Sequence, residues 1–271
     1  VRNDMLPYEC DVTFSGSPDD VRAGLLSGEL DIAAVPVNMA AALYNKTGGE
    51  ILTLAANTLG VLYIVEKGDT VQSMADLAGK KILAAGQGST PEYVINYLLE
   101  KNGLTDSVEV EYVSEHAEAV TQMAAGNADL ILVPEPFVTT ALSKVEGARV
   151  ALDLTQEWAK VSDADMVMGC LVVSKAFAEA DPQALRHFMT QYAVSADYCT
   201  SHPAEAAALI EKFGIMGSAA LAEKAIPNCN IVCVTGQEMV DMVTGMLTVL
   251  FDANPKSVGG SLPGEEMFYL G

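Results

Sequence analysis

The chain has 271 residues, half of them hydrophobic, and its 36 acidic and 15 basic residues give a formal net charge of −21. Nucleic-acid phosphates are bound by clustered Lys and Arg, so this composition argues against a nucleic-acid partner. No apolar run reaches the roughly 18 uncharged residues of a membrane-spanning helix. Val1 is also not followed by the basic and apolar regions of an export signal.

Short apolar runs alternate with segments of helical period along most of the chain. The expected strands cover residues 9–14, 31–35, 51–56, 59–66, 81–85, 108–113, 129–133, 148–152 and 168–174. The expected helices cover residues 18–27, 38–44, 69–77 (a short linker), 91–101, 116–125, 136–144, 175–201, 203–213, 217–226 and 236–252. This alternation predicts an α/β fold with mainly parallel sheets flanked by helices.

The chain repeats itself at an offset of 98 positions. Residues 10–36 align with residues 108–134 without a gap, and both copies end in Gly-x-x-Asp, an apolar run and Pro. A repeat of this length is a whole lobe, because solenoid units have only about 20–50 residues. Two similar lobes in one chain predict a cleft between them, and small molecules commonly bind in such clefts.

Residues 59–66 and 168–174 share a pattern in which Gly precedes an apolar run. We interpret them as two segments that cross a hinge, near residues 64–70 and 164–170. Lobe one would then comprise residues 1–66 and 171–271, and lobe two residues 67–170.

The second copy opens with a strand over residues 81–85 and a helix over residues 91–101. At the same offset, the matching unit of the first copy would fall before Val1. We therefore expect the first lobe to lack its leading strand, with residues 1–5 as the tail of the helix that follows it.

The sharpest local motif is Gly-Gln-Gly-Ser-Thr-Pro at residues 86–91. Two glycines let a backbone approach a ligand closely, and Ser or Thr followed by Pro is a typical helix start. The N–H groups at a helix start attract anions, so the motif predicts an anion site, although an ordinary capped loop has the same pattern. It is not a phosphate-binding P-loop, because the Gly-Lys-Ser/Thr ending is absent.

Other polar residues follow expected strands, where ligands of α/β proteins bind. Residues 36–39 and 134–137 occupy equivalent places in the two copies, and each segment follows a strand and opens a helix. Asn38 would cap its helix and present an amide, whereas Glu135 is either a helix-stabilising acid or an acceptor for a ligand amine or hydroxyl. The candidate ligand-binding residues are Asn38, Met39, Asn57, Thr58, Gly86, Gln87, Gly88, Ser89, Thr90, Tyr93, Glu135 and Asp165.

No catalytic or metal-binding set emerges from the sequence. His116, His187 and His202 lack a nucleophile signature or a metal-ligand spacing, and we expect solvent-exposed or structural roles for them. The five cysteines are an odd number, and no His lies near Cys229 or Cys233 in sequence, so we expect buried thiols. We predict no metal, no cofactor and no enzymatic activity.

The chain resembles the solute-binding proteins of bacterial ABC importers with the type II periplasmic-binding-protein fold, in the branch that binds nitrate, sulfonates, taurine, bicarbonate and thiamine precursors. The resemblance covers most of residues 10–175. Its motifs are Gly-Glu-Leu-Asp-Ile-Ala at 28–33, Leu-Ala-Gly-Lys-Lys-Ile at 77–82, residues 86–93 with 97–104, Gly-Asn-Ala-Asp at 126–129 and Pro-Glu-Pro at 134–136. The leading strand and its loop, which contribute to the pocket in this family, have no counterpart here.

The resemblance implies an exported monomer, either free in a periplasm or lipid-anchored to the outer face of the cytoplasmic membrane. Such a protein closes two lobes around one small molecule and delivers it to an ABC permease in the membrane. We favour a small organic anion or zwitterion, such as a sulfonate or carboxylate, with a heterocyclic vitamin precursor such as a thiamine precursor as the alternative. An enzyme of the same fold is a second alternative, and the effector domain of a transcription regulator is a third.

Overall fold

The computed structural model describes residues 10–15 and 17–271, and these form two compact units. Unit 1 takes the chain up to Leu59, together with Val167–His202 and Ile231–Gly271. Unit 2 takes Gly60–Met166 and Pro203–Asn230. Among the described residues, no helix is both long enough and apolar enough to cross a membrane.

This division differs from the expected one in three places. Residues 60–66 lie in unit 2 rather than with lobe one, and residues 167–170 lie in unit 1 rather than with lobe two. The largest difference concerns residues 203–230, which were expected in lobe one. They belong to unit 2, so the chain changes unit four times rather than twice. The cause is helix packing: α9 (Pro203–Lys212) packs against α10 (Ala219–Ala225), and α10 contacts α5 (Phe137–Lys144) of unit 2. A helical period identifies a buried face but not the partner that covers it.

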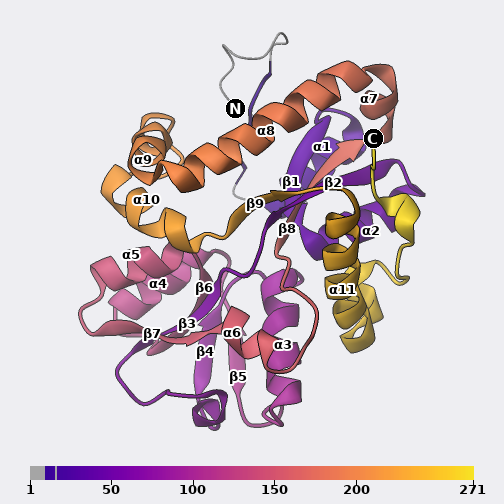
Figure 1. Cartoon of the computed structure of the whole chain (residues 1–271). Helices are drawn as coiled ribbons and strands as arrows, with labels where there is room; N and C mark the ends of the chain where they lie inside the picture. Colours follow the sequence, from indigo (N-terminus) through magenta and orange to yellow (C-terminus); the bar gives the residue numbers. More distant parts are fainter. Residues whose placement is uncertain (1–9, 16) are drawn as a thin grey trace. The chain divides into compact units, whose positions relative to one another are not determined.

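Unit 2 contains a five-stranded sheet in the order β5-β4-β6-β3-β7 (Figure 1). The strands are β3 (Leu62–Lys67), β4 (Lys81–Ala84), β5 (Glu109–Tyr112), β6 (Leu130–Pro134) and β7 (Ala148–Asp153). β4 runs parallel to both of its neighbours, as strands joined by helices do, whereas β3 runs antiparallel to β6 and β7. The helices of this unit also include α3 (Thr90–Lys101), α4 (His116–Ala124) and the short α6 (Leu154–Ala159).

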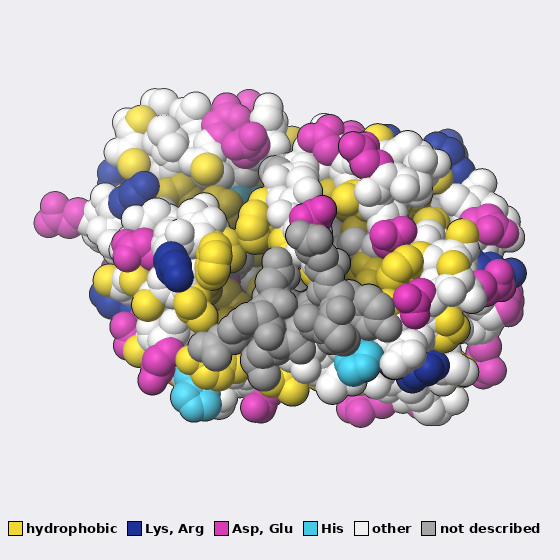
Figure 2. Space-filling model, turned by 90° about the horizontal axis from the view of Figure 1, so that it is seen from above, with side chains coloured by type: hydrophobic (Ala, Val, Ile, Leu, Met, Phe, Trp, Pro, Cys, Tyr) yellow, Lys and Arg dark blue, Asp and Glu magenta, His cyan; other side chains and the backbone are white. Residues whose placement is uncertain are grey.

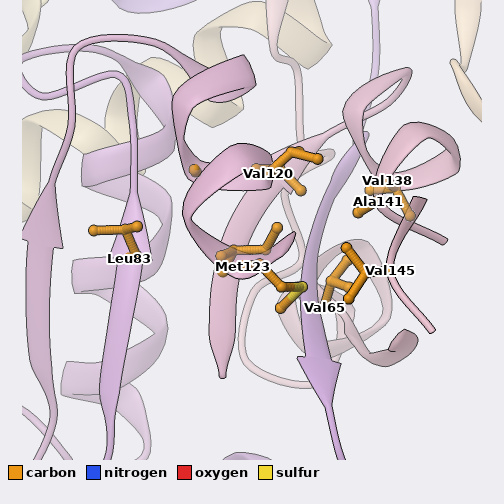
Figure 3. Packing of buried hydrophobic residues seen from close by; sticks show 10 residues of the cluster. Val65, Leu83, Val120, Met123, Val138, Ala141 and Val145 are labelled. Atoms are coloured by element: carbon orange, nitrogen blue, oxygen red, sulfur yellow. The ribbon is translucent and has the colours of Figure 1, made fainter. Parts of the chain in front are cut away.

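One face of this sheet packs against α4 and α5. Figure 3 shows Val65 and Leu83 from the strands facing Val120 and Met123 of α4 and Val138 of α5. Alternate strand residues, such as Ile64 and Ile82, point to the opposite face and are equally buried. A strand that is buried on both faces reads as a continuous apolar run, which is why the sequence located these strands well.

Unit 1 contains a four-stranded sheet in the order β1-β8-β2-β9. The strands are β1 (Ile32–Pro36), β2 (Ile51–Thr58), β8 (Gly169–Ser174) and β9 (Ile231–Val234). Its helices are α1 (Pro18–Ser27), α2 (Val37–Thr47), α7 (Lys175–Ala180), α8 (Pro182–Ser201) and α11 (Gly236–Ala253). Leu54, Leu171 and Leu185 are central to a core beneath α7 and α8.

The two sheets share a three-strand pattern that follows the sequence repeat. β1 and β6 have the same bounds at the offset of 98 positions, and β1-β8-β2 matches β6-β3-β7 in order and direction. β3, β8 and β9 each follow a change of unit, and all three run antiparallel to their neighbours. The unit 2 sheet is therefore mixed and the described strand pairs of the unit 1 sheet are all antiparallel, where the alternation of strands and helices alone predicted mainly parallel sheets.

The described part of the expected strand over residues 9–14 is not a strand. Residues 10–14 make no ladder, and Val12 and Phe14 are 60% and 66% exposed. Their counterpart in unit 2 is β5, which pairs with β4, and β4 in turn pairs with β6. In unit 1, β1 corresponds to β6, and no described strand pairs with it on the side away from β8. An alternating segment without a partner strand has nothing to satisfy its backbone groups in a sheet. The expected helix tail over residues 1–5, like Glu9, lies outside the described residues.

Candidate functional site

In unit 2, three loops lie at one edge of the sheet. β5, β4 and β6 are neighbouring parallel strands, so the loops after them leave from the same edge. These loops carry residues 85–89, 113–115 and 135–136. The structure therefore brings the glycine motif and Glu135 to the same edge of one unit.

The glycine motif forms a tight turn into α3. Gly86 and Gly88 have φ values of +85° and +75°, which favour glycine, and a Cβ on Gly86 would lie 3.2 Å from Pro91 Cγ. Ser89 is the N-cap residue, but its side chain makes no capping hydrogen bond. Its hydroxyl is therefore not committed to the helix, whereas Thr90 is buried in the first turn.

This loop already binds one carboxylate, that of Glu92. Gly88 N–H donates to Glu92 Oε2 at 2.5 Å. Glu92 also raises the pKa values of Tyr93 and Tyr112, in each case after the larger effect of burial. Glu92 was not among the residues expected at the site, although an acid in the first turn of a helix is a recognisable signal.

Glu135 is buried and its carboxylate is held by its own helix. Thr139 donates its backbone N–H to Oε2 and its hydroxyl to Oε1, both at 3.0 Å. Burial raises the pKa of Glu135, although the hydrogen bonds from Thr139 oppose that shift. Of the two roles left open by the sequence, the structure thus shows the helix-stabilising one, and ligand contact stays a prediction.

The two remaining unit 2 candidates differ in their surroundings. Tyr93 is half-buried beside the glycine turn, and Asp165 is exposed in the irregular segment between α6 and β8. A hydrogen bond holds the segment in place, because Trp158 Nε1 donates to Ala164 O at 2.6 Å. The Trp158 ring in turn packs against Tyr97, with ring centroids 4.8 Å apart.

In unit 1, the other candidates lie at the edge where β1 and β2 end. Pro36 and Thr58 both pair with Gly169 of β8, one from each side. Asn38, Met39, Asn57 and Thr58 therefore lie at one edge of this sheet. Asn38 does not cap α2 as expected: its helix starts at Val37, and its amide donates to Ser257 O at 3.3 Å.

Asn57 is buried, and Thr58 Oγ1 donates to its Oδ1 at 3.2 Å. The Asn57 side chain also lowers the pKa of the Tyr192 phenol, on α8, against the larger, raising effect of burial. Tyr192 was not a candidate in the sequence, because the interaction joins residues more than 130 positions apart and no local pattern signals it.

His116, at the start of α4, packs on Phe137 with ring centroids 5.4 Å apart, and its buried Nδ1 has no partner. Burial lowers its pKa to about 4. The folded state then disfavours the proton that the unfolded chain takes up below pH 6.5, so stability declines as the pH falls from 6.5 towards 4.

When the pH falls from 7.5 to 5.5, we expect the burial of His116 to lower the unfolding free energy of wild type by about 1 kcal/mol. A His116→Phe variant should lose less over the same range in urea denaturation. A His202→Gln variant, changed at an exposed histidine, should keep the wild-type slope. Equal slopes for wild type and His116→Phe would contradict this assignment.

Among the residues described, neither charged side chains nor metal-ligating side chains form a second candidate site. Acidic side chains are scattered over the described part of the face drawn in Figure 2 rather than gathered in one patch. No group of three or more His, Cys, Asp or Glu side chains in the described ranges has the geometry to hold a metal ion.

Comparison with known proteins identifies the family. The family model described as "ABC transporter, phosphonate, periplasmic substrate-binding protein" matches residues 3–225. An ABC transporter structure from Parabacteroides distasonis is similar at 27% identity, over 96% of this chain and 88% of that chain, with a TM-score of 0.80. No curated protein matched in the corresponding search.

Two sulfonate-binding proteins share the fold at lower identity. The periplasmic aliphatic sulphonate-binding protein SsuA of Escherichia coli has 15% identity and a TM-score of 0.74, over 93% of this chain and 80% of that one. The alkanesulfonate-binding SsuA of Xanthomonas axonopodis pv. citri, bound to MOPS, has 17% identity and a TM-score of 0.69, over 93% and 83%. With the family model covering most of its length, the chain belongs to the periplasmic substrate-binding proteins of the phosphonate ABC transporter family.

Proposed function

We propose that this substrate-binding component captures a small organic anion or zwitterion whose head group is a sulfonate or a carboxylate. The observation that carries the proposal is the glycine turn before α3, where a backbone N–H already holds a carboxylate oxygen of Glu92. The amides and hydroxyls of this turn would bind the oxygens of a ligand in the same way.

The absence of Lys and Arg from the candidate loops favours a ligand with a singly charged head group. Residues 36–39, 57–60, 86–93 and 134–137 contain no Lys or Arg. A doubly charged phosphate or phosphonate group would lack a cation to balance its second charge. The sulfonate names of two structural neighbours agree with this choice, whereas the family model is named for phosphonates.

The carboxylates of Glu135 and Asp165 are the groups we assign to the amine of a zwitterionic ligand. Neither has a Lys or Arg partner among its described contacts. We further propose that the protein acts as a monomer outside the cytoplasm, free or lipid-anchored, that it passes its ligand to a membrane permease, and that it performs no chemistry.

Calorimetry with a small panel tests the ligand class. The panel contains ethanesulfonate, taurine, propionate, ethylphosphonate and the hydroxymethylpyrimidine of thiamine. We expect the tightest binding for a sulfonate or carboxylate. Tightest binding of ethylphosphonate would show that the doubly charged group is accommodated, and tightest binding of the pyrimidine would favour the vitamin-precursor alternative. Either result would overturn the proposal.

Glu92 gives a second test of the anion site. Because its carboxylate occupies the Gly88 N–H, we expect a Glu92→Ala variant to bind ethanesulfonate about fivefold more tightly than wild type. Glu100→Ala removes the same charge from the exposed far end of α3 and should change the affinity less than twofold. Weaker binding by Glu92→Ala would mean that this carboxylate supports the ligand rather than competing with it.

A further inference from the structure

The Asp165 carboxylate is exposed, and the backbone on both sides of it is held in place. Among the described residues, no hydrogen bond or ion pair takes up this carboxylate. The carbonyl of Ala164, just before it, accepts the hydrogen bond from Trp158 Nε1, and Met166, just after it, is only 3% exposed. A charged group whose position is fixed before binding loses less entropy when it binds a ligand.

The segment that leads to Asp165 is held by hydrogen bonds from the end of α6 onwards. Val161 N–H and Ser162 N–H both donate to Trp158 O at 3.0 Å, and Ala164 N–H donates to Ser162 Oγ at 3.1 Å. The hydroxyl of Tyr97, on α3, donates to Val161 O at 3.1 Å. Side chains from two helices, α3 and α6, therefore bind carbonyls of this irregular segment.

Tyr97 and Trp158 also support each other. Their ring centroids are 4.8 Å apart, and the two residues are 9% and 2% exposed. A buried Tyr or Trp usually finds a hydrogen-bond partner for its polar atom, and here both partners are carbonyls of residues 161–164. The pair thus attaches the Asp165 segment to α3, the helix that begins at the glycine turn.

We propose that Tyr97 and Trp158 are positioning residues that fix Asp165 for recognition of a ligand amine, so that a zwitterion is preferred to a simple anion. This inference rests on the proposed function, in which the turn before α3 binds the head group and Asp165 contacts the amine. All the residues involved belong to unit 2. Because one helix carries the turn and braces the Asp165 segment, the two ends of the ligand would be bound at a fixed separation.

Pairs of compounds that differ only in the amine measure the contribution of Asp165. Taurine differs from ethanesulfonate in this way, and β-alanine differs from propionate in the same way if the head group is a carboxylate. An ammonium group bound by a carboxylate makes charge-assisted hydrogen bonds. We therefore expect wild type to bind the amine-containing member of the pair more tightly.

Calorimetry of such a pair gives the ratio of the two affinities. We expect Asp165→Asn to lower the ratio by about tenfold and Tyr97→Phe by about threefold to fivefold, while the amine-free compound binds almost as before. A variant with both changes should have the ratio of Asp165→Asn, because Tyr97 acts through Asp165. Tyr198→Phe removes the same hydroxyl from α8 of unit 1 and should keep the wild-type ratio.

The possible outcomes separate this inference from the proposed function. Equal affinities of wild type for both members of the pair, or an unchanged ratio in Tyr97→Phe, would overturn the inference. A merely structural role of Tyr97 would weaken both compounds alike and so leave the ratio in place. Failure of wild type to bind any compound of either pair would instead refute the proposed function.

Amide hydrogen exchange provides a readout that needs no ligand. We expect Tyr97→Phe and Trp158→Phe to exchange faster than wild type over residues 160–166, and Tyr198→Phe to exchange at the wild-type rate. Trp158 is the single tryptophan of the chain, so an unchanged fluorescence maximum in Tyr97→Phe would show that the ring packing is intact. Wild-type exchange over this segment in Tyr97→Phe would refute the positioning role.

Discussion

A Glu66→Ala variant is expected to lose about 3 kcal/mol of unfolding free energy in unit 2. Glu66, on β3, is only 3% exposed, and its two carboxylate oxygens accept four hydrogen bonds. Thr70 donates to one oxygen from its backbone and its hydroxyl, at 3.0 and 2.6 Å. Val71 N–H and Arg149 Nη2 donate to the other, at 3.2 and 2.6 Å.

The large effect follows from what the substitution leaves behind. Arg149 also donates to the carbonyls of Gly68 and Val71, so removing Glu66 leaves a partly buried guanidinium and several N–H groups without their acceptor. Breaking one partner of a buried pair costs about 3–5 kcal/mol, and we take the lower end because Arg149 is 30% exposed.

The pH dependence provides a further check. Burial raises the pKa of Glu66, but the hydrogen bonds from Thr70 and Val71 and the charge of Arg149 outweigh it, so the pKa is lowered overall. The stabilisation is therefore present above pH 4.5 and is lost as the pH falls through the lowered pKa.

Urea denaturation of wild type, Glu66→Ala and Glu179→Ala measures the effect. Glu179 pairs with Lys175 at 4.0 Å on an exposed helix, and its removal should cost less than 0.5 kcal/mol. A loss below 1 kcal/mol for Glu66→Ala would show that the network around Glu66 is not the main support of residues 68–71.

The sequence predicts the central strands of both units well because their burial is a local property. β1 and β6 are continuous apolar runs that end in Pro, and the repeat aligns them residue by residue. The turn before α3 was equally visible, because Gly and Pro restrict the backbone whatever surrounds them.

Elements whose structure depends on partners distant in sequence were not predicted correctly. Residues 10–14 have a strand pattern but no described strand beside them, whereas β9, which was not expected, is a strand because β2 offers it an edge. The assignment of α9 and α10 to a lobe failed for a similar reason. Burial on one face is encoded locally, but the identity of the covering surface is not.

The candidate site shows the same limit at the level of side chains. Loop residues such as Ser89 and Asn57 were found because they follow strands. Their partners were not: Tyr192 lies on a helix of unbroken amphipathic pattern, and its interaction with Asn57 depends on the packing of α8 against the sheet. Glu135 was found, but the two hydrogen bonds that its carboxylate accepts from Thr139 were not expected.

Replacing Ser89 and Thr90 together by Ala is expected to weaken binding of an organic anion by about 1–3 kcal/mol, or roughly 5- to 150-fold. The reason is the loss of one or two hydroxyl donors at the start of α3, in a loop that has no Lys or Arg to compensate. Ser89 makes no capping hydrogen bond, so its hydroxyl can reach a ligand without destabilising the helix.

Calorimetry with ethanesulfonate on wild type, Ser89→Ala and the double variant separates binding from folding. Thr90 is only 1% exposed, so the double variant should also melt at a lower temperature, whereas Ser89→Ala should melt like wild type and still bind more weakly. Thr121→Ala removes an exposed hydroxyl from α4, away from the turn, and should leave the affinity unchanged. If both Ser89→Ala and the double variant bind with wild-type affinity, the start of α3 is not the anion site, and the ligand must be held by the residues at the edge of unit 1.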